Sequence, residues 1–154
     1  MSFLIPPFSS LSFFLMLRRQ PKSTLFPYTT LFRSNNYGQL GDGGWMDRLT
    51  AAPVLLLHNV TAAAAGKEHA CAVSGGAAVC WGYNADGRLG DGSTTDRCLP
   101  SALVGITGVT TVSCGFSHTC LRLDSGVLRC AGLNTLGQLG DGTTIDHLTP
   151  GFVH

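Results

Sequence analysis

The chain has 154 residues, of which 12% are charged and 44% are hydrophobic, a balance that favours a globular protein over a disordered one. Its formal net charge of +1 combines two unlike parts, since residues 1–34 carry +4 and residues 35–154 carry six Lys/Arg against nine Asp/Glu, a net of −3. Nucleic-acid binding requires clustered Lys and Arg, so residues 35–154 are not expected to bind nucleic acid.

Residues 1–34 differ in composition from the rest of the chain. They hold six of the eight Phe but no Gly and no Cys, whereas all 20 Gly and all six Cys follow them. Pro6 and Pro7 interrupt the apolar run, and Arg18 and Arg19 follow it, an order that argues against a secretory signal peptide. The run is also too short for a spanning helix, so no membrane insertion is expected.

Residues 24–34 read TLFPYTTLFRS, which at all eleven positions is the conceptual translation of a common short-read sequencing adapter. Residues 16–23 agree with the upstream translation of that adapter except at three positions, each explained by a single-base change. We therefore interpret residues 16–34 as a non-biological segment, and we expect the same of residues 1–15. Any structure of residues 1–34 would carry no functional meaning.

An internal repeat of about fifty residues fills the rest of the chain. The pattern N-x-x-G-[QR]-L-G-D-G occurs three times, and its first glycines, 49 and 50 residues apart, are Gly38, Gly87 and Gly137. A second pattern, G-x-x-H-x-C, occurs twice between these copies. The repeats divide the chain into units at 35–83, 84–133 and, in part, 134–154.

The runs between Gly and Asp are too short for helices and rich in β-branched residues, so they predict strands. In the second unit we expect strands at 109–114, 118–123 and 127–130, and a fourth after Pro100, near residues 102–104. Short antiparallel sheets at this period are typical of propeller blades. The expected fold is all-β, with two complete four-stranded antiparallel blades and part of a third.

These motifs, with C-W-G closing the first unit, resemble the regulator of chromosome condensation repeat family over residues 35–154, most closely its Cys-bearing bacterial branch. The resemblance implies a seven-bladed β-propeller that binds other proteins through loops on its faces. This chain would then be a fragment cut at both ends, with the remaining blades of its parent as partners. Nucleotide exchange on a small GTPase, a role known in the family, is a less favoured alternative, because the exchange loops cannot be placed on this sequence.

The cysteines suggest a bridge within each blade. If the turn at residues 74–77 pairs Val73 with Ala78, two cysteines of the unit face each other at a spacing that a disulfide allows. The expected pairs are Cys71–Cys80 and Cys120–Cys130, with Cys98 and Cys114 as a possible extra pair. The alternative is reduced cysteine used as small apolar filler in a cytosolic propeller.

The repeated polar residues are expected to be structural. His69 could join Cys71 and Cys80 in a zinc site, but its recurrence as His118 favours a histidine that orders a strand-loop corner. The aspartates of L-G-D-G resemble part of a calcium loop, yet calcium needs five or more converging oxygens, and turn capping is favoured. These aspartates are Asp42, Asp91 and Asp141. No metal or cofactor is expected.

The sequence favours a protein-protein interaction module over an enzyme, because no catalytic pair stands out from the repeat background. Contacts with the partner, an unidentified protein, are expected at loop positions that vary between units. The candidates are Trp45, Met46, Lys67 and Phe116. The alternative is a piece of a propeller enzyme, a lyase or hydrolase with its site at the central channel. The parent is expected in the envelope of a bacterium or outside the cell.

Overall fold

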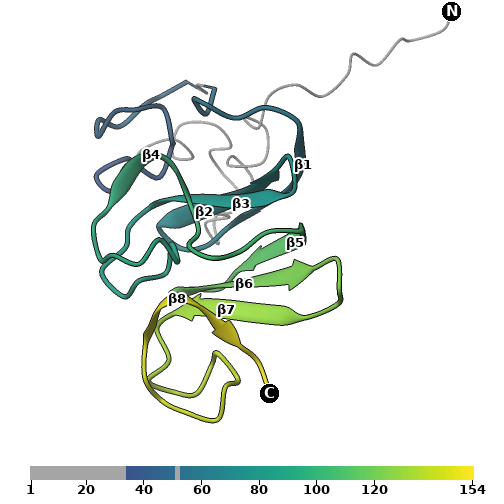
Figure 1. The fold of residues 1–154 in the computed structure, drawn as a ribbon. Coiled ribbons are helices and arrows are strands. Elements are labelled where there is room, and N and C mark those ends of the chain that lie inside the picture. The colour runs from purple at the N-terminus through teal and green to yellow at the C-terminus, as the bar shows by residue number, and fades with distance from the viewer. Residues whose placement is uncertain (1–33, 51–52) are drawn as a thin grey trace, which may run out of the picture.

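The computed structural model describes residues 34–50 and 53–154 (Figure 1). The proposed adapter-derived segment therefore falls outside the described residues, except for Ser34. Within the described ranges all regular elements are strands, and no helix there is long and apolar enough to cross a membrane.

The strands form two four-stranded antiparallel sheets, as expected. The first sheet has the order β1-β2-β3-β4, with β1 (Val60–Ala65), β2 (His69–Ser74), β3 (Ala77–Gly82) and β4 (Arg97–Ala102). The second has the order β5-β6-β7-β8, with β5 (Val109–Cys114), β6 (His118–Leu123), β7 (Leu128–Gly132) and β8 (His147–Phe152). Each sheet is a simple up-and-down meander.

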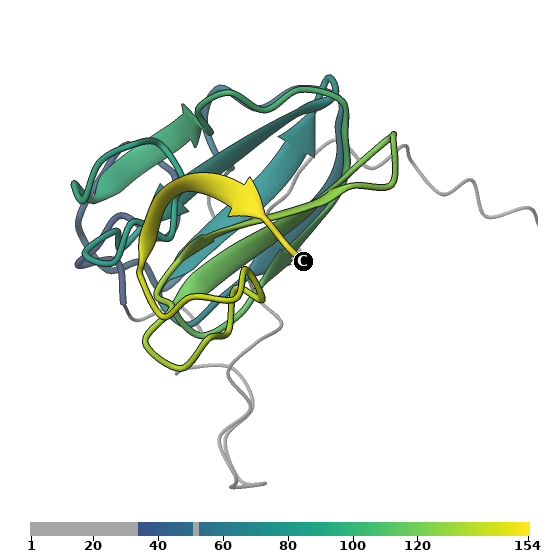
Figure 2. The ribbon, with the colours of Figure 1, turned by 60° about the horizontal axis from the view of Figure 1, so that its bottom comes forward.

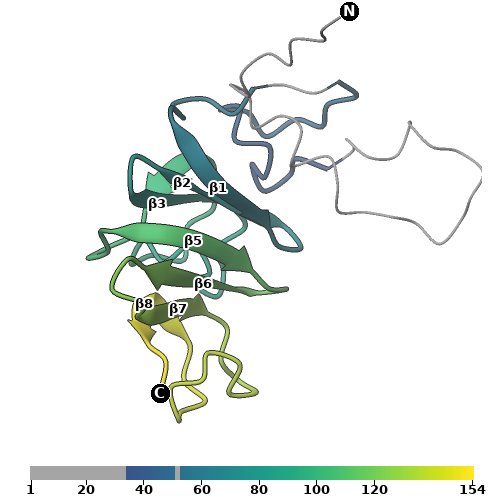
Figure 3. The same ribbon diagram turned by 90° about the vertical axis from the view of Figure 1, so that its right-hand side faces the viewer.

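The two sheets pack against each other, and β5 lies against β1 and β2 (Figure 3). Leu89, from the loop before β4, is fully buried in this interface together with Val112 and Leu121 of the second sheet. Removing these apolar side chains from water is the main favourable term that holds one sheet on the next.

Described residues before β1, among them Gln39, Val54 and Leu57, pack on the other face of the first sheet. Trp81 is fully buried there with Val54, and its indole Nε1 donates a hydrogen bond to the carbonyl of Gln39 at 3.0 Å. Residues 34–50 and 53–59 therefore supply part of a further layer against the first sheet.

The sheet boundaries differ from the unit boundaries expected from sequence. The fourth strand of each sheet follows an N-x-x-G-[QR]-L-G-D-G loop, so units that start at Asn84 and Asn134 begin inside a sheet. The strand expected near 102–104 starts at Arg97 and belongs to the first sheet, and residues 134–154 complete the second sheet through β8. Periodicity gives the length of a repeat but not its phase, which depends on strand pairing.

The two longest connections, residues 83–96 and 133–146, lie at one end of the sheets together with two shorter ones, because consecutive antiparallel strands place alternate connections at the same end. The two shorter connections at this end are residues 66–68 and 115–117. Figure 2 shows the loops before β4 and β8 on one side of the molecule and the β2–β3 and β6–β7 turns on the opposite side. We call the end with the long loops the loop face.

Candidate protein-binding loop face

Each long loop is built around a buried asparagine. The backbone N–H of Asn84 donates to Oδ1 of Asp96 at 2.7 Å, and its side-chain Nδ2 donates to Oδ1 of Asp91 at 3.1 Å. Its Oδ1 accepts from the N–H of Leu89 at 3.0 Å, which brings Leu89 into the core. Asn35 and Asn134 repeat these contacts in the other two loops. The asparagines open every copy of the repeat, yet they were not among the expected site residues.

The aspartates of L-G-D-G cap the turns of their own loops. Oδ1 of Asp91 accepts from the N–H of Ser93 at 3.0 Å, and Asp42 and Asp141 accept in the same way from residues two positions on. Burial alone would raise the pKa of Asp91, yet hydrogen bonds from Ser93 and Arg97 hold it below its ordinary value. These carboxylates serve the loops, a role that fits turn capping better than a calcium loop.

The first glycine of each repeat lies in the left-handed region of φ. Gly38, Gly87 and Gly137 have φ of 72°, 70° and 72°. A Cβ at Gly38 would lie 2.4 Å from Cα of Cys98 in β4, so a side chain there would clash with the backbone of the strand. Glycine therefore allows the loop to turn and to pack directly on the fourth strand of the next sheet.

The expected disulfides Cys71–Cys80 and Cys120–Cys130 are both present, within register pairs of β2–β3 and β6–β7. The possible extra pair is not formed. Cys98 lies in β4 beside Gly38, whereas Sγ of Cys114 in β5 is 3.6 Å from the carbonyl oxygen of Ala64. The two residues belong to different sheets and face different neighbours.

His69 and His118 occupy corners between strand and loop. The ring of each lies where a Cβ of the preceding glycine, Gly66 or Gly115, would be. Nε2 of His69 is 3.0 Å from Oγ1 of Thr119 in the second sheet, a hydrogen bond between blades. Burial, with smaller effects from Arg88 and His118, lowers the pKa of His69 to about 3. The ring is therefore neutral at physiological pH.

An aromatic and cationic cluster crosses the loop face. The rings of Tyr37 and Tyr83 lie 4.5 Å apart, and the guanidinium of Arg88 is 4.6 Å from the centre of the Tyr83 ring. Arg88 pairs with Asp86 and donates to the carbonyl of Phe116 at 3.4 Å. Nζ of Lys67 lies 4.7 Å from the centre of the Phe116 ring. We call Tyr37, Lys67, Tyr83, Arg88 and Phe116 the loop-face cluster.

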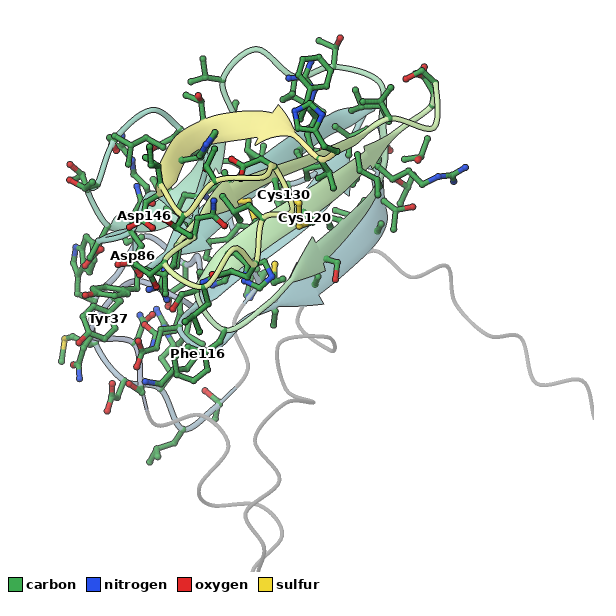
Figure 4. All side chains as sticks on the ribbon, turned by 90° about the horizontal axis from the view of Figure 1, so that it is seen from below. Tyr37, Asp86, Phe116, Cys120, Cys130 and Asp146 are labelled. Atoms are coloured by element: carbon green, nitrogen blue, oxygen red, sulfur yellow. A yellow bond between two sulfur atoms is a disulfide. The ribbon has the colours of Figure 1, made fainter. Side chains whose placement is uncertain are left out.

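Two of the four expected contact residues, Lys67 and Phe116, lie in the loop-face cluster. Its other three members, Tyr37, Tyr83 and Arg88, were not predicted from the sequence. Figure 4 shows Tyr37, Asp86 and Phe116 along one edge of the molecule, away from the Cys120–Cys130 bridge inside the sheet. Trp45 and Met46 are exposed in the first loop, and the described ring contacts of the cluster do not involve Trp45. Arg88 could have been noticed from the sequence, because the other two repeats have Gln at its position.

Two family models of the same repeat match parts of the sequence. The regulator of chromosome condensation (RCC1) repeat matches residues 76–122, and a second model of that repeat matches residues 109–138. No curated protein matches the chain.

Solved structures share the fold. Human WBSCR16 is 25% identical with a TM-score of 0.66 over 80% of this chain and 34% of that one. Yeast RCC1 (Prp20), crystallised with Kap60 bound, is 20% identical with a TM-score of 0.69 over 80% of this chain and 32% of that one. Prp20p from Saccharomyces cerevisiae, in a study of its binding to Gsp1p and histones, is 20% identical with a TM-score of 0.62 over 78% of this chain and 32% of that one.

The chain spans about a third of the length of these structures. Its two meander sheets, packed side by side, correspond to blades of their β-propellers. The matched repeats and the sheet architecture agree with one another: residues 76–138 match the RCC1 repeat, and the fold is that of RCC1-type propeller blades.

Proposed function

We propose that these blades belong to a β-propeller that binds another protein through its loop face, with the loop-face cluster at the contact. The observation that carries the proposal is the exposure of Phe116, 66% of whose surface is accessible although the residue sits among ordered polar and aromatic groups. A large apolar ring held at the surface in this way is typical of a contact residue.

The composition of the cluster supports a protein partner. Tyrosine, phenylalanine and arginine are enriched in protein interfaces and dominate their binding energy. Arg88 is almost fully buried and is held by Asp86 and by the Phe116 carbonyl, so it supports the aromatic rings from beneath. Because these side chains are already ordered, binding would lose little side-chain entropy.

The relatives support the same class of partner. Yeast RCC1 (Prp20) has been crystallised with the protein Kap60, and Prp20p has been studied for its binding to Gsp1p and histones. Those proteins share only the fold with this chain at 20% identity, so the partner proposed here is a protein of unspecified identity.

The two disulfides support an oxidising location for the parent protein, such as the cell envelope of a bacterium or the extracellular space. Bridges of this kind persist in such compartments and are rare in the cytosol. Both bridges join facing residues of a hairpin, which suits a structural role.

Site-specific photo-crosslinking tests the proposal. A benzoylphenylalanine at position 116 should crosslink a distinct protein partner, whereas the same group at Val127 should not. Val127 is exposed beside the β6–β7 turn, at the end of the sheet opposite the loop face.

With the captured partner purified, Phe116→Ala should weaken binding about tenfold or more, since a central aromatic residue contributes on the order of 2 kcal/mol. Val127→Ala should leave the affinity unchanged. Equal crosslinking from both positions, or equal affinity of both variants, would show that the loop face is not the binding surface.

A further inference from the structure

Two cysteines and a histidine meet at the interface between the two sheets. Sγ of Cys71, Sγ of Cys114 and a ring nitrogen of His69 all lie within 4.8 Å of one another, and all three residues are buried. Cys71 is bonded to Cys80, while Cys114 belongs to neither disulfide. The interface therefore places a thiol of one blade beside a disulfide of the next.

The hydroxyl of Thr119 lies at the centre of this group. Its Oγ1 is 3.0 Å from Nε2 of His69, 3.6 Å from Sγ of Cys71 and 3.9 Å from Sγ of Cys114, to which it donates. The thiol of Cys114 also donates to the carbonyl oxygen of Ala64 at 3.6 Å. Exchange requires the thiolate, which is the nucleophile, so it should proceed at alkaline pH.

These residues could also be interpreted as a metal site. Metal ligation requires deprotonated thiolates, and Cys71 is oxidised. In the bridged protein Cys71 is therefore a target for a nucleophile and not a metal ligand.

We propose that Cys71, Cys80 and Cys114 form an internal thiol–disulfide exchange site. Cys114 loses its thiol proton, and its sulfur forms a bond to Sγ of Cys71. The Cys71–Cys80 bond breaks, and Cys80 leaves with the electron pair and takes up a proton. The number of disulfides is unchanged, so no oxidant or reductant is consumed.

The consequence is a change in what the bridge connects. The Cys71–Cys80 bond staples β2 to β3 within one blade, whereas a Cys71–Cys114 bond would join β2 to β5 in the neighbouring blade. Exchange thus converts a bridge within a blade into a covalent lock between blades.

The second disulfide provides an internal control. Thr119 pairs with Cys114 in the β5–β6 register, and its side chain approaches that of Cys114. Cys120 is the next residue along β6, so its side chain points to the opposite face of the sheet, away from Cys114. The Cys120–Cys130 bridge should therefore stay unchanged while Cys71–Cys80 exchanges.

Peptide mapping of the full 154-residue chain distinguishes the two bonding patterns. The chain is purified without reductant, incubated at mildly alkaline pH, then denatured in mild acid with N-ethylmaleimide and digested with trypsin. Cleavage after Lys67, Arg88, Arg97, Arg122 and Arg129 yields peptide 68–88, with Cys71 and Cys80, and peptide 98–122, with Cys98, Cys114 and Cys120. Peptide 98–122 stays joined to peptide 130–154 through the Cys120–Cys130 bridge. Exchange links peptide 68–88 to peptide 98–122 and places the maleimide on Cys80.

In the wild-type chain we expect the 68–88 to 98–122 crosslink together with labelled Cys80. Cys114→Ala should abolish both signals, and Cys98→Ser, which removes the other thiol outside the disulfides, should leave them unchanged. A wild-type chain in which Cys80 never acquires label overturns the proposal, and so does loss of the signal in Cys98→Ser alone.

A trapping variant keeps the test independent of how well Cys114→Ala folds. In the double variant Cys80→Ser, Cys98→Ser, incubation with oxidised glutathione should join Cys71 to Cys114. If both residues instead carry separate maleimide or glutathione adducts, the sulfurs do not meet and the proposal is wrong.

Discussion

The backbone amide of Asn84 donates a hydrogen bond to Oδ1 of Asp96 at 2.7 Å, and this contact ties the start of the loop between β3 and β4 to its end. The fully buried Asn84 side chain also binds Asp91, Leu89 and Thr95. It donates to the carbonyl of Ser93 as well, so one side chain binds four other residues of its loop.

Replacement of Asn84 by alanine should destabilise the chain by about 3 kcal/mol, because several buried polar partners lose their hydrogen bonds at once. Urea denaturation followed by tryptophan fluorescence measures this loss. Asn36→Ala is the matched control, since Asn36 is exposed, and its change should stay within about 0.5 kcal/mol. Similar urea midpoints for the two variants would show that the Asn84 side chain does not stabilise the loop.

The folded chain should lose stability in mild acid because of His69. Its pKa is about 3 in the folded state against an ordinary value of 6.5, so the unfolded chain binds more protons between these pH values. The contribution of His69 is fully present above pH 6.5 and is lost as the pH falls toward 3. At pH 5 the loss should be on the order of 2 kcal/mol relative to pH 7.

Urea midpoints measured across this pH range test the prediction, with His69→Gln as the variant. Glutamine can still reach Thr119 but does not titrate, so its stability should depend less on pH than that of the wild type. An unchanged pH slope in His69→Gln would assign the acid sensitivity to other groups.

Removal of the second disulfide should cost about 3 kcal/mol. The bridge closes a short loop, with a sequence separation of 10 between Cys120 and Cys130, and so it restricts the unfolded chain. The double variant Cys120→Ala, Cys130→Ala should show this loss in urea denaturation without reductant. In the presence of reductant, wild type and variant should have nearly equal stability, and a persistent gap would point to packing by the cysteines instead.

Gly132 should tolerate no side chain. Its φ is 112°, and a Cβ there would lie 2.6 Å from the carbonyl oxygen of Ser117 and 2.8 Å from Cα of His118, both in the backbone. Gly132→Ala should therefore destabilise the chain by about 3 kcal/mol or more. Thermal unfolding by circular dichroism measures the effect.

Gly105 separates the steric effect from the backbone strain. It has a φ of 69°, but a Cβ there would meet nothing within 4 Å. Gly105→Ala should cost only about 1 kcal/mol, the strain of a left-handed alanine. Equal losses for the two alanine variants would mean that the contacts around Gly132 relax freely.

Features that depend on near neighbours along the chain could be predicted from the amino-acid sequence. The spacing of Gly and Asp allowed only short strands, and a tight hairpin fixed the register that sets Cys71 opposite Cys80. These predictions succeeded because alternation along a strand and the geometry of a short turn involve only a few consecutive residues.

Tertiary structure alone decided which segments lie together across long separations. The phase of the repeat depends on β3 pairing with β4 across the loop of residues 83–96, and that pairing leaves no periodic signal of its own. Tyr37, Tyr83 and Phe116 come from three separate loops, and Thr119 reaches Cys71 from 48 residues away. Such contacts arise from the packing of one sheet on the next, which local sequence patterns do not encode.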